Sequence, residues 1–312
     1  MELWHYTDLN AARSILKTGE LWLTDINSHT INDEKEGDWA RHVLQEYFEG
    51  KLYELVKEKI TDLPEQKLRE LAAEEIKDRL EILFKKALWD KDNLDADFKG
   101  FILSLSKDNP EHGLLSMWRG YGGKQPVALV FDGDALIRTI KSSFYDDKYL
   151  LNFPVYYARK LDDVIYQKDI NDYLNILEQT INHLDFQERP KENDQKVFLP
   201  ILQLAMRIKH QGFQEEQEYR ICFTIVTDPE LNTPEDHQAY ENYRKNLRIE
   251  KKSDVDRLII SLDGQLPKVL KKLVIGPAKN QDEIVQPLKP LRNKLGYGIQ
   301  IIKSDIPFKS NT

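Results

Sequence analysis

The chain has 312 residues, with 45 basic and 53 acidic side chains that give a formal net charge of −8 at pH 7. This length suffices for a substantial core, and the negative balance argues against a protein held on nucleic acid by bulk charge. A single cysteine, Cys222, excludes a disulfide within the chain, and no apolar run approaches the roughly 20 residues that cross a bilayer. Together with an N-terminus that lacks a signal-peptide pattern, these features predict a soluble cytoplasmic protein with no membrane partner.

The N-terminal residues predict a strand, a helix and a second strand. Residues 3–7 suit a strand, and capping-type residues then precede an apolar spacing over 11–16 that is typical of a helix. Gly19 is expected to end that helix, and residues 21–24 form the second predicted strand. The polar segment 27–36 is expected to be a loop.

Residues 36–98 are predicted to form a helical insertion packed on a sheet. Apolar side chains recur at helical spacing over 39–48, and Gly50 is expected to interrupt or kink this helix. A capping-box pattern at Asp62 and Glu65 opens a second helix. Its apolar stripe is expected to be scaffold, and a partner-binding surface is the alternative. The stripe comprises Leu68, Leu71, Ala72, Ile76, Leu80, Leu83, Phe84 and Ala87.

Strands return from Gly100 onward. The apolar run 101–106 places Ser104 and Ser106 two positions apart, and hence on one face of a strand. Residues 117–124 are expected to form a glycine-rich turn, which lacks the Walker spacing of a phosphate-binding loop. Its two aromatic rings are candidates to stack on a planar ligand. Further strands are predicted at 127–131 and 153–158, and helices at 166–184 and 197–208.

The stretch 213–225 carries charge into a predicted strand. Because side chains alternate faces along a strand, Glu216, Glu218 and Arg220 are expected on one face, with apolar residues on the other. Such a charged group costs free energy unless something uses it, which favours a functional site. The plainer interpretation is a surface strand end where Arg220 pairs with either glutamate. Cys222, in the same strand, is expected to be a small buried hydrophobe.

The remaining residues complete an α+β pattern. A polar loop and helix are expected over 228–252, followed by strands at 257–262, 273–275 and 299–303 and a helix over 281–295. Strands and helices are interspersed from end to end, which predicts a single α+β domain over 1–312. Helical insertions are placed at about 36–98, 160–211 and 228–250.

Several chemistries are set aside. The seven histidines form no pair at metal-ligand spacing, and one cysteine cannot build a structural zinc site, so no metal is expected. There is no Gly-x-Ser-x-Gly nucleophile elbow. A nucleophilic Cys222 would need an exposed thiol, which its strand context disfavours.

A set of short motifs, taken in chain order, resembles one family. The motifs are His5-Tyr6-Thr7, Asn32-Asp33 followed by Glu36, Ser104-Leu105-Ser106, Trp118 with Tyr121, Phe213 ahead of Glu216-x-Glu218-x-Arg220, and Ile275-Gly276-Pro277. They resemble bacterial domain-of-unknown-function family 2971 over almost the whole chain. That family in turn looks like a distant relative of ADP-ribosyltransferases. The resemblance implies a mixed β-sheet core similar to the split sheet of those enzymes.

The resemblance also implies a binding site for NAD. It places His5 and Thr7 against the adenosine side of NAD and Ser104 or Ser106 beside the nicotinamide ribose. An aromatic ring, Tyr121 or Trp118, would then stack on the nicotinamide. The implied NAD-binding residues are His5, Tyr6, Thr7, Ser104, Ser106, Trp118, Tyr121 and Arg220. The chain departs from the transferases in having no clean Ser-Thr-Ser motif, which leaves the role of the middle strand open.

The same resemblance implies catalytic roles for two glutamates. Glu218 corresponds to the catalytic carboxylate, and Glu216 to the residue that assists the acceptor. Breaking the bond between nicotinamide and ribose creates an oxocarbenium-like centre, which a fixed carboxylate stabilises as charge develops. A nucleophile on a macromolecule, or water, then captures the sugar without a metal.

The expected partners are therefore NAD as a substrate and a macromolecular acceptor, either protein or nucleic acid. Transferases of this kind serve as bacterial toxins or in phage defence, which implies a neutralising antitoxin as a further partner. A non-catalytic module that binds a nucleotide or a partner protein is the alternative. A nuclease is disfavoured by the negative charge balance and by the lack of a metal-binding carboxylate cluster.

Overall fold

The computed structural model describes most of the chain. The described residues are 1–26, 36–59, 64–71, 74, 98–143, 150–164, 166–183, 203–226, 241, 247–252, 255–262, 264–296 and 298–307. They confirm the predicted α+β class with a mixed sheet and several helices.

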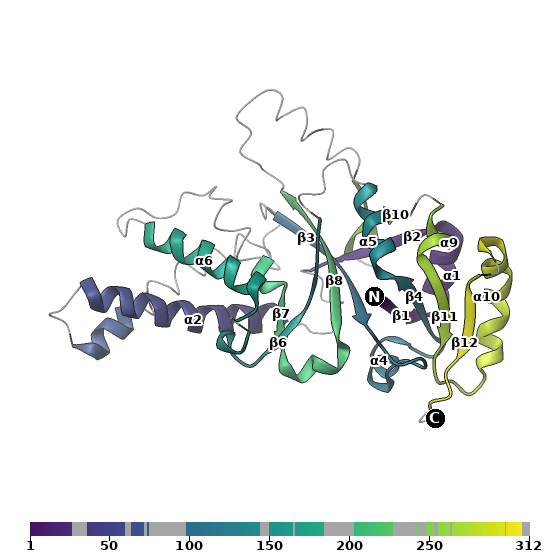
Figure 1. Cartoon of the computed structure of the whole chain (residues 1–312), viewed down its shortest axis with the longest axis horizontal. Helices are drawn as coiled ribbons and strands as arrows, with labels where there is room; N and C mark the ends of the chain where they lie inside the picture. The colour runs from purple at the N-terminus through teal and green to yellow at the C-terminus, as the bar shows by residue number, and fades with distance from the viewer. Residues whose placement is uncertain are drawn as a thin grey trace.

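Ten of the described strands form one mixed sheet (Figure 1). Its main path runs through β12 (Gln300–Lys303), β11 (Leu270–Ile275), β4 (Pro126–Asp132), β1 (Glu2–Asp8), β3 (Phe98–Lys107), β2 (Glu20–Asp25), β10 (Val255–Ser261) and β9 (Arg248–Lys252). β8 (Glu218–Val226) pairs with β3, and β5 (Leu150–Pro154) pairs with β8. β11 and β12 run parallel, and the other pairings in this sheet are antiparallel.

The sheet divides along one edge of β3. At one end of this edge, β1 pairs through Trp4 with Ser106, and at the other end β2 pairs through Thr24 with Ile102. Neither register covers Ser104, so β1 and β2 leave β3 on either side of this residue. The opposite edge of β3 is paired with β8 from Phe98 to Ser106. The split is therefore formed by β1 and β2 on one edge of β3, and β8 holds the other edge.

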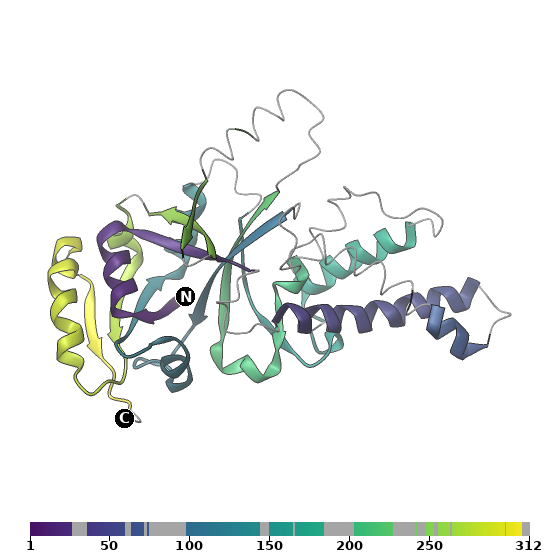
Figure 2. The ribbon, with the colours of Figure 1, turned by 180° about the vertical axis from the view of Figure 1, so that it is seen from behind.

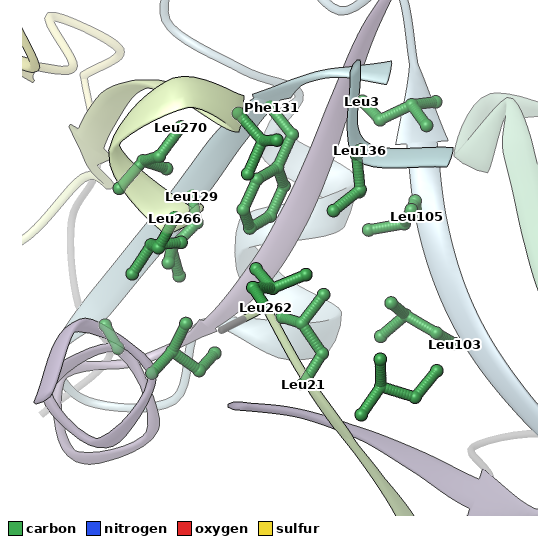
Figure 3. Packing of buried hydrophobic residues seen from close by; sticks show 14 of the residues in the cluster. Leu3, Leu21, Leu103, Leu105, Leu129, Phe131, Leu136, Leu262, Leu266 and Leu270 are labelled. Atoms are coloured by element: carbon green, nitrogen blue, oxygen red, sulfur yellow. The ribbon is translucent and has the colours of Figure 1, made fainter. Parts of the chain in front are cut away.

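The largest hydrophobic cluster lies between the two halves of the divided sheet. Leucines from β1, β2, β3 and β4 meet in it, as Figure 3 shows for Leu3, Leu21, Leu103 and Leu129. Four helices contribute apolar residues to the same cluster: α1 (Leu9–Thr18), α5 (Gly133–Ser142), α9 (Leu266–Val269) and α10 (Gln281–Leu295). Burial of these side chains is the main force that holds the two halves together.

A helical lobe extends from the β8 side of the sheet. α2 (Glu36–Lys59) and α6 (Lys168–His183) lie alongside each other at the end of the molecule opposite α10 (Figures 1 and 2). A two-stranded parallel sheet of β6 (Tyr156–Ala158) and β7 (Ile208–His210) joins them, with the 3₁₀ turns η1 (Leu161–Asp163) and η2 (Gln211–Glu216). Their hydrophobic cluster includes Ile102 of β3 and Cys222 of β8, so the lobe packs on one face of these two strands.

The segment 117–124 was expected to be a glycine-rich turn, but its residues up to Tyr121 belong to a helix. α4 (Leu115–Tyr121) is followed by Gly122 and Gly123, and only Gly123 has a positive φ, of 56°. Trp118 of this helix is buried, and its indole nitrogen donates to the carbonyl of His112 at 2.9 Å. A Cβ on Gly276 would approach the Trp118 ring to 2.6 Å. Glycine at this position is therefore required by close packing against the indole.

Most predicted elements are present, and several bounds are corrected. The first helix ends at Gly19 with φ 69°, and α10 spans the predicted residues. α2 continues through Gly50 without interruption. The predicted strand 153–158 is divided between β5 and β6, which belong to different sheets.

Two of the expected helical insertions end in strands. The insertion expected over 160–211 contains α6, but its last residues form β7, and the one over 228–250 runs into β9. In the 36–98 insertion Leu68 is buried while Leu71 is 43% exposed. Other predicted features lie outside the described residues: Asn32, Asp33, Asp62, Ala72, Ile76, Leu80, Leu83, Phe84, Ala87, the loop 27–35 and most of the helix over 197–208.

Candidate functional site

Four charged side chains meet at the junction between η2 and β8. Glu218 and Arg220 of β8 are 5% and 3% exposed, and Lys209 of β7 is 5% exposed. The Lys209 ammonium lies 2.8 Å from Glu216 Oε2 and 3.3 Å from Glu218 Oε2. Two positive and two negative charges are thus brought together in a largely buried cluster, which we call the Glu218 cluster.

The backbone at Gln217 explains why both glutamates reach Lys209. Glu216 is the last residue of η2 rather than part of the strand, which corrects the expected alternation from Glu216 to Arg220. Gln217 has φ 45°, a left-handed conformation that is uncommon for a residue with a side chain. Its carbonyl accepts from the amide of Lys107 at 2.9 Å, which ties this turn to the end of β3.

Glu218 is held as a carboxylate. Nε and Nη2 of Arg220 donate to its two oxygens at 2.8 and 3.1 Å, and the Glu218 amide donates to the Tyr157 hydroxyl at 2.6 Å. Burial works to raise the pKa of Glu218, but the charges of Arg220 and Lys209, with hydrogen bonds from Arg220 and Ser104, lower it to about 2. Glu218 is therefore ionised at neutral pH.

Glu216 lies closer to solvent, with its side chain 16% exposed. The Tyr121 hydroxyl donates to its Oε1 at 3.0 Å, and Lys209 donates to its Oε2. The Ser106 hydroxyl donates to the Glu216 carbonyl and lies 3.2 Å from Oδ1 of Asn109. α4 and β7 thus fix the position of this carboxylate, and β3 fixes the backbone of the same residue.

Ser104 of β3 connects the Glu218 cluster to His5 of β1. It is exposed, and its hydroxyl contributes a hydrogen bond that lowers the pKa of Glu218. Burial lowers the pKa of His5 to about 4, against the effect of a hydrogen bond to the backbone of Ser104. The His5 ring is therefore neutral at pH 7. Its Nδ1 is buried and has no hydrogen-bond partner within the described part of the chain.

The other candidates on β1 and α4 are placed differently. Trp4 pairs with Ser106, so Tyr6 shares the face of the Glu218 cluster, whereas His5 and Thr7 point to the opposite face. Tyr6 is buried against Trp118, with ring centroids 4.6 Å apart, and burial raises its pKa. Of the two aromatic rings predicted to stack on a ligand, Trp118 is core and Tyr121 contacts Glu216.

Three residues of the site were missed by sequence reasoning: Lys209, Tyr157 and Asn109. Lys209 falls at the end of an expected helical insertion, and only its pairing with Glu216 and Glu218 reveals its role. The sequence contains one indication of this role, since Lys209 lies only seven residues before Glu216, in a stretch that also contains Phe213. The ammonium lies 4.6 Å from the centroid of the Phe213 ring.

Two features are absent from the described residues. In the part of the chain that the structure describes, no three His, Cys, Asp or Glu side chains are arranged to hold a metal ion. Within the same part, no helix has the length and apolar character needed to cross a membrane.

The fold and site define an α+β protein with a buried, charge-balanced cluster at the split of its sheet. A family model described as "Protein of unknown function (DUF2971)" matches residues 117–221. The match supports the resemblance to that family and covers most of α4, β7, η2 and the start of β8, which carry Tyr121, Lys209, Glu216 and Glu218. No curated protein and no solved structure matches the chain.

Proposed function

We propose that the protein is an ADP-ribosyltransferase-like enzyme that uses NAD and carries its catalytic carboxylate at Glu218. One observation carries the proposal. Three neighbouring strands place His5 against the backbone of Ser104 on one face of the sheet and the Ser104 hydroxyl against Glu218 on the other. These are the residue types and strand positions that the resemblance to the transferases implies, at a split in the sheet.

The chemistry follows from the state of Glu218. When the bond between nicotinamide and ribose breaks, its electron pair leaves with nicotinamide and positive charge develops on the ribose. A carboxylate with a pKa of about 2 is ionised at neutral pH and can accept a hydrogen bond from a ribose hydroxyl. Arg220 and Lys209 keep it in one position, so little reorganisation is needed as the charge develops.

Glu216 is proposed to assist the acceptor. It is more exposed than Glu218 and lies at the edge of the cluster, where Tyr121 and Lys209 hold its oxygens. An acceptor group brought to this edge would attack the ribose and lose a proton, and the products would be nicotinamide and the ADP-ribosylated acceptor. A macromolecular acceptor, either protein or nucleic acid, fits a site at which Ser104 is exposed.

The biological proposal follows the same resemblance. We place the enzyme in the bacterial cytoplasm, as a toxin or a phage-defence effector that is neutralised by an antitoxin. Of the NAD-binding residues that the resemblance implies, Ser104 and Tyr121 are proposed to contact NAD directly. The buried residues Tyr6, Ser106, Trp118 and Arg220 support the site, and His5 and Thr7 lie on the opposite face of the sheet.

A non-catalytic binding module is the second candidate. The observation in its favour is that Lys209 and Arg220 already neutralise Glu216 and Glu218 within a buried cluster. Such a cluster can anchor β7 to β8 without any chemistry, and it then stabilises a surface that recognises a nucleotide or a partner protein.

The two candidates differ in whether the ADP-ribosyl group is transferred. The protein is incubated with a bacterial lysate and NAD labelled in its adenosine half, and labelled macromolecules are separated from free NAD. The transferase predicts labelled material that is lost with Glu218→Gln and kept with Glu215→Gln, because Glu215 is exposed in η2. Binding of NAD without labelled products or nicotinamide release would favour the binding module.

A further inference from the structure

Arg257 of β10 carries a positive charge that no described carboxylate compensates. Its Nη1 donates to the Thr24 hydroxyl at 2.7 Å, and it forms no ion pair with the acidic side chains that the structure describes. The side chain is half-buried, and this burial lowers its pKa. A guanidinium removed from water without an anionic partner is costly unless a ligand supplies that anion.

The strand register places Arg257 on the same face of the sheet as Ser104. Arg257 pairs with Thr24, and Thr24 pairs with Ile102, so these three side chains lie on one face. Ser104 follows Ile102 by two residues on β3 and therefore shares this face. Trp22, two residues before Thr24 on β2, lies there as well and flanks the split.

A second cation and an aromatic ring lie next to Arg257. The ammonium of Lys252, on β9, is 4.8 Å from the centroid of the half-buried Trp22 ring. Lys252 is exposed. This part of the face thus combines two cations, a hydroxyl and an indole.

The nearest acidic side chains on this face are already occupied. Glu250 is the direct cross-strand neighbour of Arg257, but it accepts from Arg248 at 2.6 and 2.9 Å. Arg248 also pairs with Glu20. These three residues carry a net charge of −1, so that together with Arg257 and Lys252 this part of the face has a surplus of one positive charge.

We propose that Trp22, Thr24, Lys252 and Arg257 form a subsite for the diphosphate of a nucleotide ligand. A guanidinium binds phosphate oxygens through two parallel hydrogen bonds, and the indole offers a surface for stacking. The identification of the ligand as NAD rests on the proposed function, with the nicotinamide end at Glu218 and the diphosphate towards Arg257. Ser104 lies between these two ends of the face.

Calorimetric titration with ADP and with adenosine tests the subsite. The wild type is expected to bind ADP at least about tenfold more tightly than adenosine, because charge-assisted hydrogen bonds to the diphosphate contribute to ADP binding alone. Arg257→Gln should remove that difference, and Lys252→Gln should reduce it. Lys251→Gln is the matched control, because Lys251 is exposed on the opposite face of β9, and it should bind ADP as the wild type does.

Equal ADP affinity in the wild type and Arg257→Gln would overturn the subsite, and so would a wild type that does not distinguish ADP from adenosine. If Arg257→Gln does not fold, Lys252→Gln decides, and unchanged ADP affinity in that variant overturns the inference. ADP binding that depends on Arg257 without any nicotinamide release from NAD would keep the subsite and refute the transferase. If the wild type and Arg257→Gln both release nicotinamide with the same KM for NAD, the transferase is supported and the subsite is refuted.

Discussion

At the scale of single residues, the Glu218 cluster determines how the protein responds to acid. The folded-state pKa of Glu218 is lowered to about 2, below the value of about 4.3 expected in an unfolded chain. A lowered pKa contributes stability above the unfolded pKa, and this contribution is lost as the pH falls through the folded value. Between pH 7 and about 2, the free energy of unfolding should therefore fall more steeply in the wild type than in Glu218→Gln.

Urea unfolding at a series of pH values measures this difference. Glu215→Gln is the matched control, because it removes one carboxylate from an exposed position of η2, outside the Glu218 cluster. Parallel curves for the wild type and Glu218→Gln would show that Glu218 does not have a lowered pKa in the folded protein.

The two glutamates should also differ in their effects on the reaction. Glu218 lies in a strand and is held by Arg220, whereas Glu216 lies at the more exposed edge. Glu216→Gln should reduce transfer to an acceptor yet spare much of the NAD hydrolysis, since water still reaches the ribose. Glu218→Gln should depress both activities by about 10²-fold or more. Loss of hydrolysis in Glu216→Gln but not in Glu218→Gln would reverse the two roles.

At the scale of elements, the packing of α4 depends on a glycine that follows β11. A Cβ at Gly276 would lie 2.6 Å from the Trp118 ring and 2.7 Å from Pro126. Gly276→Ala should therefore destabilise the protein by about 1–3 kcal/mol through overpacking. Gly120, within α4, has open space around the same position, so Gly120→Ala should be neutral or stabilising by up to about 1 kcal/mol. Thermal unfolding of both variants distinguishes them, and equal stability would contradict the close packing.

Elements with strong local signals could be predicted from the sequence, and those created by tertiary contacts could not. α10 is marked by periodic apolar residues and by acidic residues in its first turn, so its bounds were predictable. α4 contains Gly120 and precedes two more glycines, which suggested a turn. Its helix is stabilised by burial of Met117 and Trp118, which the local sequence does not reveal.

In the candidate site, too, residues with a local sequence signal were predictable, and residues brought in by tertiary contacts were not. Glu216, Glu218 and Arg220 were found because their charges precede an apolar strand. Lys209 was missed because β7 is a three-residue strand that exists only through its pairing with β6. The left-handed conformation of Gln217, which turns Glu216 towards Lys209, has no marker in the sequence.

At the scale of the whole molecule, the helical lobe is expected to be scaffold that supports the site. Arg220 Nη1 donates to the carbonyl of Met206, and Cys222 lies in the hydrophobic cluster of the lobe, so β8 and the lobe are packed together. Leu68 belongs to that cluster, and Leu68→Ala should destabilise the protein by about 2–5 kcal/mol. Leu71→Ala should change stability by about 0.5 kcal/mol or less, because Leu71 is 43% exposed.

Denaturant unfolding of the two leucine variants tests this role. A Leu68→Ala protein with wild-type stability that no longer binds a partner protein would show that the stripe is an interaction surface.

The most direct test of the central claim is the release of nicotinamide from NAD by the purified protein. We expect release by the wild type and by Glu215→Gln, and a rate lower by about 10²-fold or more in Glu218→Gln. Circular dichroism must show that Glu218→Gln is folded, because removing its charge leaves Arg220 and Lys209 without a full partner. Equal rates in the wild type and a folded Glu218→Gln, or no release by the wild type even with lysate as a source of acceptors, would contradict the claim.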